Sequence, residues 1–178
     1  MSETEFAIGR HCGVTFAGLK IASLVSLAKG EEDVIAGLSR RFAKKGFAFK
    51  LLRKDKDRLL VYICHRERLE KHLALPETRA FLARFGYEYA AAEEALEQLQ
   101  ARMGGEFPHE IGVFLGYPLA DVRGFLRNPN GCVLCGCWKV YENADEAART
   151  FERYRRCSEC ICRHMENGRS LTQIFNVV

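Results

Sequence analysis

The sequence predicts an α+β domain in which a small, mostly antiparallel sheet of three strands is covered by helices. Two short runs rich in aromatic and aliphatic residues, 47–53 and 59–64, flank the polar stretch 54–57, as in a β-hairpin. A third run of this kind, 133–141, is the candidate third strand, and helical spacing dominates elsewhere. A hairpin alone would be marginal, whereas three strands with helical cover form a stable unit.

The elements before the hairpin are predicted to be two helices. Residues 13–28 place apolar side chains at helical spacing with a wide apolar face. Residues 31–33 are acidic, which favours a helix N-terminus, and apolar residues continue at helical period until Gly46 ends the helix. In the hairpin that follows, the run 59–64 is apolar at successive positions, so we expect this strand to be covered on both faces.

The elements after the hairpin are expected to be mostly helical. In the last long helix, acidic residues come early and basic residues late, in the order that the helix dipole favours. Between two shorter helices, Gly116 is expected to be a left-handed cap and Pro118 restricts the residue before it, so the chain turns a corner there. The predicted helices are 66–73, 77–85, 92–103, 109–115, 119–126 and 144–156, with a short turn at 171–175.

Composition indicates one globular domain over residues 1–178, with a cysteine-rich part at about 131–164. Of the 178 residues, 48% are hydrophobic and 28% are charged, which excludes a disordered chain. No apolar run is long enough for a membrane span, and the acidic start lacks the features of a signal peptide. We therefore expect a cytoplasmic protein without a membrane partner. The net charge of +4 is too small to favour a nucleic-acid partner.

Most of the eight cysteines lie in two clusters of the C-terminal third. In a reducing cytoplasm, clustered thiols are more often metal ligands or redox groups than disulfides. Each cluster contains C-x2-C followed by a further cysteine two positions on, and two C-x2-C loops supply the four thiolates that zinc or an iron–sulfur cluster prefers. We expect zinc or an iron–sulfur cluster on Cys132, Cys135, Cys157 and Cys160, with Cys137, Cys162 and His164 as possible further ligands.

The two clusters are predicted to meet in space. A strand from Cys135 to Tyr141 advances about 20 Å at about 3.3 Å per residue. A helix from Ala144 to Cys157 returns about 20 Å at about 1.5 Å per residue. If the helix packs back along the strand, Cys135 and Cys157 share one ion. The alternative is that several of these cysteines are small buried hydrophobic residues.

Two other classes of function compete with metal or redox binding. The first is a thiol-dependent enzyme with Cys12 or a C-terminal cysteine as nucleophile and His109 or His11 as base. Cys12 precedes the first predicted helix, where the helix dipole would lower its pKa. His109 opens a helix beside Glu110, which would tune its pKa. No nucleotide-binding or hydrolase motif is present, so the sequence indicates no particular reaction.

The second competing class is a module that binds RNA or a protein through a zinc knuckle. The basic helix end at residues 153–156 supplies positive charge, and Trp138 and Tyr154 are the nearby aromatic residues on which bases would stack.

Residues 107–118 have the sequence FPHEIGVFLGYP, which is the longest of several segments that are similar to a known family. These segments resemble a family of clostridial proteins known as domain of unknown function 3793. The resemblance spans nearly the whole chain and implies a bacterial, cytosolic protein of an anaerobe. It implies no established activity and no catalytic residues. The other resembling segments are His11-Cys12, 17–20, Asp121-Val122, Gly124-Phe125, 136–141, Phe151 and 154–157.

Overall fold

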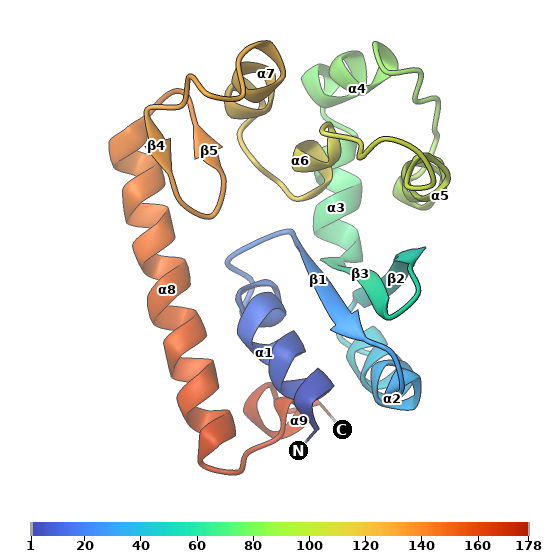
Figure 1. Cartoon of the computed structure of the whole chain (residues 1–178), viewed down its shortest axis with the longest axis vertical. Helices are drawn as coiled ribbons and strands as arrows, with labels where there is room; N and C mark the ends of the chain where they lie inside the picture. The colour runs from blue at the N-terminus through green and yellow to red at the C-terminus, as the bar shows by residue number, and fades with distance from the viewer. Residues whose placement is uncertain (1, 178) are drawn as a thin grey trace.

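A computed structural model describes residues 2–177, and its central element is a three-stranded antiparallel sheet with the strand order β1-β3-β2 (Figure 1). The predicted fold class is therefore confirmed. The predicted hairpin is also confirmed, because β2 and β3 pair along their length, with Leu51 opposite Val61. The strands of this sheet are β1 (Ala22–Ala28), β2 (Phe47–Lys54) and β3 (Arg58–His65).

Helices flank the sheet, and most of the predicted ones are present. Those at residues 66–73, 92–103 and 119–126 agree with the structure to within one residue at each end. The helices are α1 (Glu3–Phe16), α2 (Glu32–Ala43), α3 (Arg66–Leu73), α4 (Pro76–Ala83), α5 (Ala92–Arg102), α6 (Ile111–Phe114), α7 (Leu119–Arg127), α8 (Ala144–Glu166) and α9 (Leu171–Ile174).

The central strand β3 is buried on both faces, as its continuous apolar run predicted. Because side chains alternate across a strand, Val61 and Ile63 face one core and Tyr62 and Cys64 face the other. The first core packs against α1, α2, α8 and α9, and the second against α3 to α7. The sheet thus separates two apolar layers.

The third strand of the sheet is β1, and the prediction of one helix over residues 13–28 is wrong. Helix α1 ends at Phe16, and Gly18 then adopts the left-handed conformation (φ 74°). Beyond it, Ala22 and Leu24 face the second core, whereas Val25 and Leu27 face the first. This alternation has the period of a strand, and it buries apolar residues on both sides of β1.

Helix α1 also begins earlier than predicted, near the start of the chain. The Ser2 side chain accepts a hydrogen bond from the Glu5 backbone N–H at 3.1 Å, and Glu3 and Glu5 lie in the first turn. This N-cap and the acidic first turn stabilise the helix start.

The segment 133–141 is not a strand of the main sheet, so the prediction that it forms the third strand is wrong. It folds back on itself as a hairpin of two short strands, β4 (Leu134–Cys135) and β5 (Lys139–Val140), in a separate two-stranded sheet. The turn at residues 136–138 reverses the chain, so the segment does not advance along one direction.

Helix α8 begins where it was predicted but continues ten residues further, to Glu166. It runs along one side of the molecule, from the β4–β5 hairpin at its start to α1 and α9 near its end (Figure 1). Its buried residues Ala147, Ile161 and Met165 keep helical spacing throughout. Within residues 2–177, no helix has the combination of length and apolar character that crossing a membrane requires.

The predicted corner between α6 and α7 is confirmed. Gly116 has φ 75°, and Pro118 is the N-cap of α7. A Cβ on Gly116 would lie 3.1 Å from the Ile21 side chain, which leads into β1. The corner therefore brings the α6–α7 connection against the start of the main sheet.

Candidate functional site

The β4–β5 hairpin is attached to α7 through a buried carboxylate. Asp121 accepts hydrogen bonds from the Trp138 indole N–H at 2.8 Å, from the Tyr141 backbone N–H at 2.7 Å and from the Glu142 backbone N–H at 3.1 Å. The Tyr141 ring lies so close to α7 that a Cβ on Gly124 would meet it at 2.3 Å. The hairpin is thereby held in one orientation on α7.

On its other side the hairpin packs against the first half of α8. A Cβ on Gly136 would lie 2.3 Å from the Phe151 ring, so only glycine permits this close approach. The Trp138 ring meets Phe151 edge to face, with 4.6 Å between the ring centroids, and stacks on Tyr117 at 5.2 Å. The hairpin therefore carries an aromatic group between α7 and α8.

The second half of α8 packs closely on α1 through two glycines spaced four residues apart. A Cβ on Gly9 would lie 2.3 Å from the sulfur of Met165, and a Cβ on Gly13 would lie 2.6 Å from Cδ1 of Ile161. Small residues at this spacing let two helix backbones come close. Helix α8 is thus fixed to the hairpin at one end and to α1 at the other.

Between these two contacts lies a cleft of about 440 Å³, which we call the Lys20 cleft. Helix α1, the chain leading into β1, the Gly116 corner, the hairpin turn and α8 all contribute to its walls. Its polar lining consists of Arg10, His11, Lys20, Ser23, Cys137, Arg155 and Ser158. Its apolar and aromatic lining consists of Val14, Leu24, Leu115, Tyr117, Phe151 and Tyr154.

Lys20 is half-buried in this cleft, and its ammonium group lies 5.2 Å from the centre of the Tyr117 ring. Burial lowers the pKa of Lys20, because the charged form loses hydration, and the nearby thiols of Cys12 and Cys137 partly oppose this. Within the described residues 2–177, no carboxylate lies within salt-bridge distance of the Lys20 ammonium.

The other charges around the cleft are also positive. Arg10 is exposed and, among the described residues, has no carboxylate within salt-bridge distance. Arg155 differs, because it is paired with Glu152 at 2.8 Å and with Glu159. The pKa of His11 is lowered by burial and by Arg10, which favours its neutral form. No aspartate or glutamate is among the described residues that line the cleft.

The cleft's hydroxyl groups are all engaged. The Tyr117 hydroxyl donates to the Cys137 carbonyl and the Tyr154 hydroxyl to the Leu19 carbonyl, each at 3.3 Å. Ser158 donates to the Arg10 carbonyl at 2.7 Å. The Ser23 hydroxyl lies 2.7 Å from that of Thr15. These bonds fix the two tyrosine rings, and burial raises the pKa of Tyr117 to about 12, so its phenol is neutral near pH 7.

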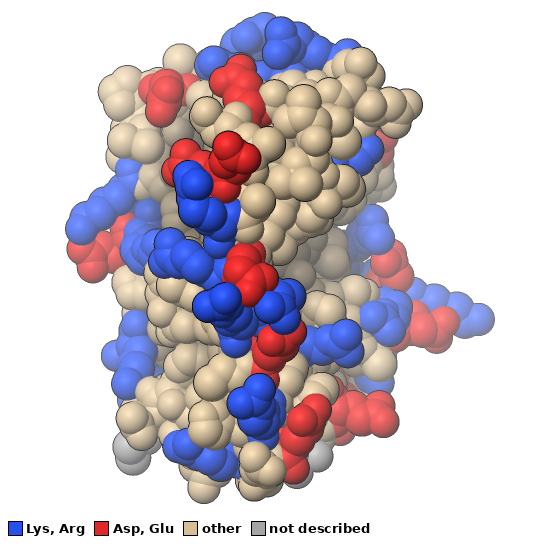
Figure 2. Space-filling model, turned by 90° about the vertical axis from the view of Figure 1, so that its left-hand side faces the viewer, with Lys and Arg blue, Asp and Glu red and all other residues tan. Residues whose placement is uncertain are grey.

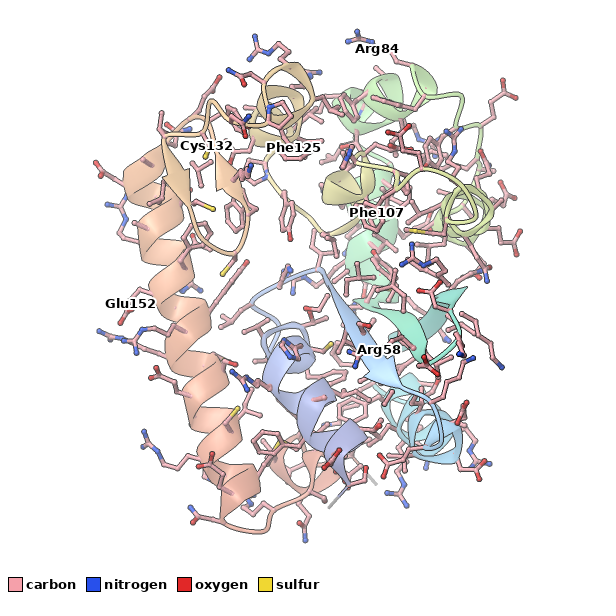
Figure 3. The ribbon with its side chains drawn as sticks, viewed as in Figure 1. Arg58, Arg84, Phe107, Phe125, Cys132 and Glu152 are labelled. Carbon is pink, nitrogen blue, oxygen red and sulfur yellow. The ribbon has the colours of Figure 1, made fainter. Side chains whose placement is uncertain are left out.

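The structure does not give the first thiol cluster the form of a metal-binding loop. A C-x2-C loop needs a tight turn between its cysteines. Here the chain bends at Val133 and then enters strand β4, where Leu134 pairs with Val140 and Cys135 with Lys139. Cys135 therefore lies in a paired strand and not at the end of a tight turn. Cys132 lies on the hairpin beside the start of α8 (Figure 3).

The second cluster lies inside α8, because the helix does not end at Arg156 as predicted. Cys157 is half-buried against the core beside α1, and Cys160 is exposed one turn further on. At about 100° per residue, Cys162 lies about 140° around the helix from Cys157. His164, in the same helix, is half-buried near Arg169.

One of the two geometric steps behind a shared ion on Cys135 and Cys157 is wrong, because the strand does not advance to Tyr141 but reverses at residues 136–138. The other step is present, since the first half of α8 packs back along the hairpin. The hairpin turn meets α8 at Phe151, and Cys157 lies about 9 Å further along the helix axis at about 1.5 Å per residue. Among residues 2–177, no three His, Cys, Asp or Glu side chains are grouped so that they could hold a metal ion.

Cys12 and His109, the residues predicted for thiol catalysis, lie in different surroundings. Cys12 is fully buried near the end of α1, and burial raises its pKa to about 12, the opposite of the expected activation. His109 is exposed and packs against Phe125, with 5.1 Å between the ring centroids, at a separate pocket of about 160 Å³. Glu110 is buried and accepts a hydrogen bond from Tyr87 at 3.0 Å.

Of the residues predicted to act in a site, His11, Cys137, Tyr154 and Arg155 line the Lys20 cleft. The cation and the ring that define the cleft, Lys20 and Tyr117, were not predicted as site residues. The signal for Lys20 was its position inside the otherwise apolar stretch 14–28. A lysine in a buried stretch needs a partner for its charge.

No curated protein and no solved structure matches this chain. A family model described as "Protein of unknown function (DUF3793)" matches residues 8–175, which include the hairpin, the Gly116 corner and every residue that lines the Lys20 cleft. This match covers nearly the whole chain and agrees with the family resemblance of the sequence. The chain therefore belongs to the DUF3793 family.

Proposed function

We propose that this protein binds a small anionic molecule, bearing a phosphate or a carboxylate group, in the Lys20 cleft. The observation that carries the proposal is the half-buried ammonium group of Lys20, which has no carboxylate partner within the described residues. Removing a charge from water is costly unless an opposite charge replaces the lost hydration. An anion held at Lys20 supplies that charge.

The rest of the cleft supports the same ligand class. Arg10 adds a second cation, and the absence of acidic side chains from the described lining removes repulsion. The volume of about 440 Å³ lies within the range of about 300–1,000 Å³ that small-molecule sites occupy. Because the ammonium must be protonated to attract an anion, binding weakens as the pH rises through the lowered pKa of Lys20.

The competing functions have less support from the geometry. Burial raises the pKa of Cys137, which lines the cleft, so its thiol is mainly neutral near pH 7 and a poor nucleophile. The basic segment 153–156, in the middle of α8, is not a free cationic surface, because Arg155 and Arg156 are both paired with Glu152. Acidic and basic side chains alternate along this face, and Glu152 points outward from α8 (Figures 2 and 3).

Calorimetric titration of the whole chain at low salt tests the proposal, with inorganic pyrophosphate as the phosphate probe and succinate as the carboxylate probe. We expect at least one probe to bind, and Lys20→Met to weaken it at least tenfold. Methionine keeps the length of the side chain and removes the charge. The matched control is Lys56→Met, which removes an exposed lysine from the β2–β3 turn and should leave binding unchanged. Absence of binding by both probes, or equal binding by the Lys20→Met protein, would overturn the proposal.

A further inference from the structure

We infer that the anion bound in the Lys20 cleft carries a planar aromatic ring next to its charged group, as an aryl phosphate or an aryl carboxylate does. The inference rests on the proposed function and adds the chemical class of the ligand. It depends on three features of the cleft: rigid aromatic walls, an apolar floor, and hydroxyl groups that already have partners.

The aromatic walls are held in place before any ligand arrives. Tyr117 and Phe151 line the cleft, and Trp138 contacts both rings, stacking on the first and meeting the second edge to face. The Trp138 indole N–H donates a hydrogen bond to the buried Asp121, and the Tyr154 hydroxyl donates one to the Leu19 carbonyl. Side chains fixed in this way lose little entropy when a ligand packs against them.

The apolar floor is made of side chains that line the same cleft as the cation. Val14, Leu24 and Leu115 line the same cleft as Lys20, and the ammonium group is 5.2 Å from the centre of the Tyr117 ring. A bare phosphate or acetate at Lys20 would leave these surfaces in contact with water. A ring attached to the anion covers them and gains from apolar burial and from ring-to-ring contact.

The hydrogen-bonding groups of the cleft argue against a sugar phosphate or another polyol. Ser158, Tyr117 and Tyr154 each donate to a backbone carbonyl, and the Ser23 hydroxyl is paired with Thr15. The hydroxyls of Ser158, Tyr117 and Tyr154 have no further O–H to donate, and a polyol placed against Val14, Leu24 and Leu115 would lose hydrogen bonds to water, which is unfavourable. An aromatic ring has no hydroxyl groups and loses no such hydrogen bonds when it packs against apolar side chains.

The test compares ligands of matched charge on the wild-type protein: phenyl phosphate with methyl phosphate, and benzoate with acetate. We expect the aromatic member of one pair to bind at least about tenfold more tightly, which corresponds to the contribution of one well-packed ring. The pair that shows this ratio identifies the anionic group as phosphate or carboxylate. The chain's single tryptophan, Trp138, also stacks on Tyr117, so its emission should change more with the aromatic ligand.

A variant in the cleft wall tests whether the aromatic ring of the ligand packs against Phe151. Phe151→Leu should reduce the ratio between the affinities for the phenyl and methyl compounds. Phe107→Leu, which changes an exposed phenylalanine outside the cleft, should leave this ratio unchanged. If the aromatic and aliphatic members bind equally to the wild-type protein, the inference is overturned and the proposed anion site stands. If no member of either pair binds and pyrophosphate and succinate also fail, the anion site itself is overturned.

Discussion

Trp138 donates its indole N–H to Asp121 across 2.8 Å, and this bond joins the β4–β5 hairpin to α7. Asp121 is only 3% exposed and accepts two further hydrogen bonds from the backbone just after β5. One carboxylate thus sets the position of the hairpin, and with it the aromatic wall of the Lys20 cleft.

Replacing Asp121 by alanine should lower the free energy of unfolding by about 3 kcal/mol, because buried N–H groups lose their charged acceptor. Urea unfolding followed by circular dichroism measures this change. Asp145→Ala, at an exposed position in the first turn of α8, is the control and should change stability by less than about 0.5 kcal/mol. Equal stability of the two variants would show that Asp121 does not hold the hairpin.

Gly13→Ala should destabilise the protein by about 1 kcal/mol, because the overpacking against Ile161 exceeds the gain in helix propensity. Ile161→Val removes the Cδ1 atom that the new Cβ would meet. In the double variant, the loss should therefore be smaller than the sum of the two single losses. Gly37→Ala in α2 is the control: a Cβ there meets nothing within 4 Å, so it should stabilise the protein by about 1 kcal/mol. Additive losses in thermal unfolding would contradict close packing of α1 on α8.

Gly116→Val should cost more than about 1 kcal/mol, since a β-branched residue is strained at positive φ and its Cβ would also press on Ile21. Gly116→Asn should cost less, because asparagine tolerates the left-handed conformation better. Melting temperatures of the two variants provide the comparison. An unchanged melting temperature for Gly116→Val would refute the left-handed corner.

The stability of the protein should fall more steeply below pH 6.5 than that of a His72→Gln variant. His72 is half-buried with a ring nitrogen 2.9 Å from the Val113 carbonyl oxygen, and burial lowers its pKa in the folded state. The unfolded chain therefore takes up the proton first, at about its usual pKa of 6.5, and is favoured as the pH falls. Above that pH, His72 is neutral in both the folded and the unfolded protein, so its contribution to the pH dependence of stability is zero. The urea midpoints of the wild-type protein and the His72→Gln variant should diverge between pH 7.5 and 5.0. Midpoints that change with pH in parallel would contradict the prediction.

Cys12 and Cys64 should resist alkylation in the folded protein. Both are buried, and burial raises the pKa of each thiol to about 12, so the reactive thiolate is scarce and inaccessible. Iodoacetamide at pH 7.5, followed by peptide mass spectrometry, should label the exposed Cys135 and Cys160 first. In urea, all four should react at similar rates. Labelling of Cys12 as fast as Cys135 in the folded protein would mean that α1 opens readily.

The central hairpin was predictable because its two apolar runs and polar turn are local features. Strand β1 was not recognised, because residues 13–28 include the end of one helix and the start of a strand, and their combined apolar positions imitate a helical face. Gly18 was the signal for the break, since it adopts the left-handed conformation that often follows a helix. Ser2 followed by Glu5 was the corresponding signal for the start of α1.

The arrangement of the cysteines could not be derived from their spacing. The C-x2-C pattern of Cys132 and Cys135 occurs here at a bend that leads into strand β4, and that of Cys157 and Cys160 occurs within a helix. Which of these conformations forms is decided by distant contacts, such as Asp121 with the hairpin and Gly13 with Ile161. For the same reason the Lys20 cleft was not predicted, because its walls come from segments that are far apart in the chain.

Helix α8 is 23 residues long, about 34 Å at 1.5 Å per residue, and its two halves pack on different neighbours. Near Phe151 its partner is the hairpin held by α7, and near Ile161 and Met165 its partner is α1. Exchange of a backbone amide hydrogen with solvent requires the local structure to open. Amides in the two halves of α8 therefore report separately on the opening of the hairpin and of the α1 layer. A ligand in the Lys20 cleft, which touches both halves, should slow exchange in both of them together.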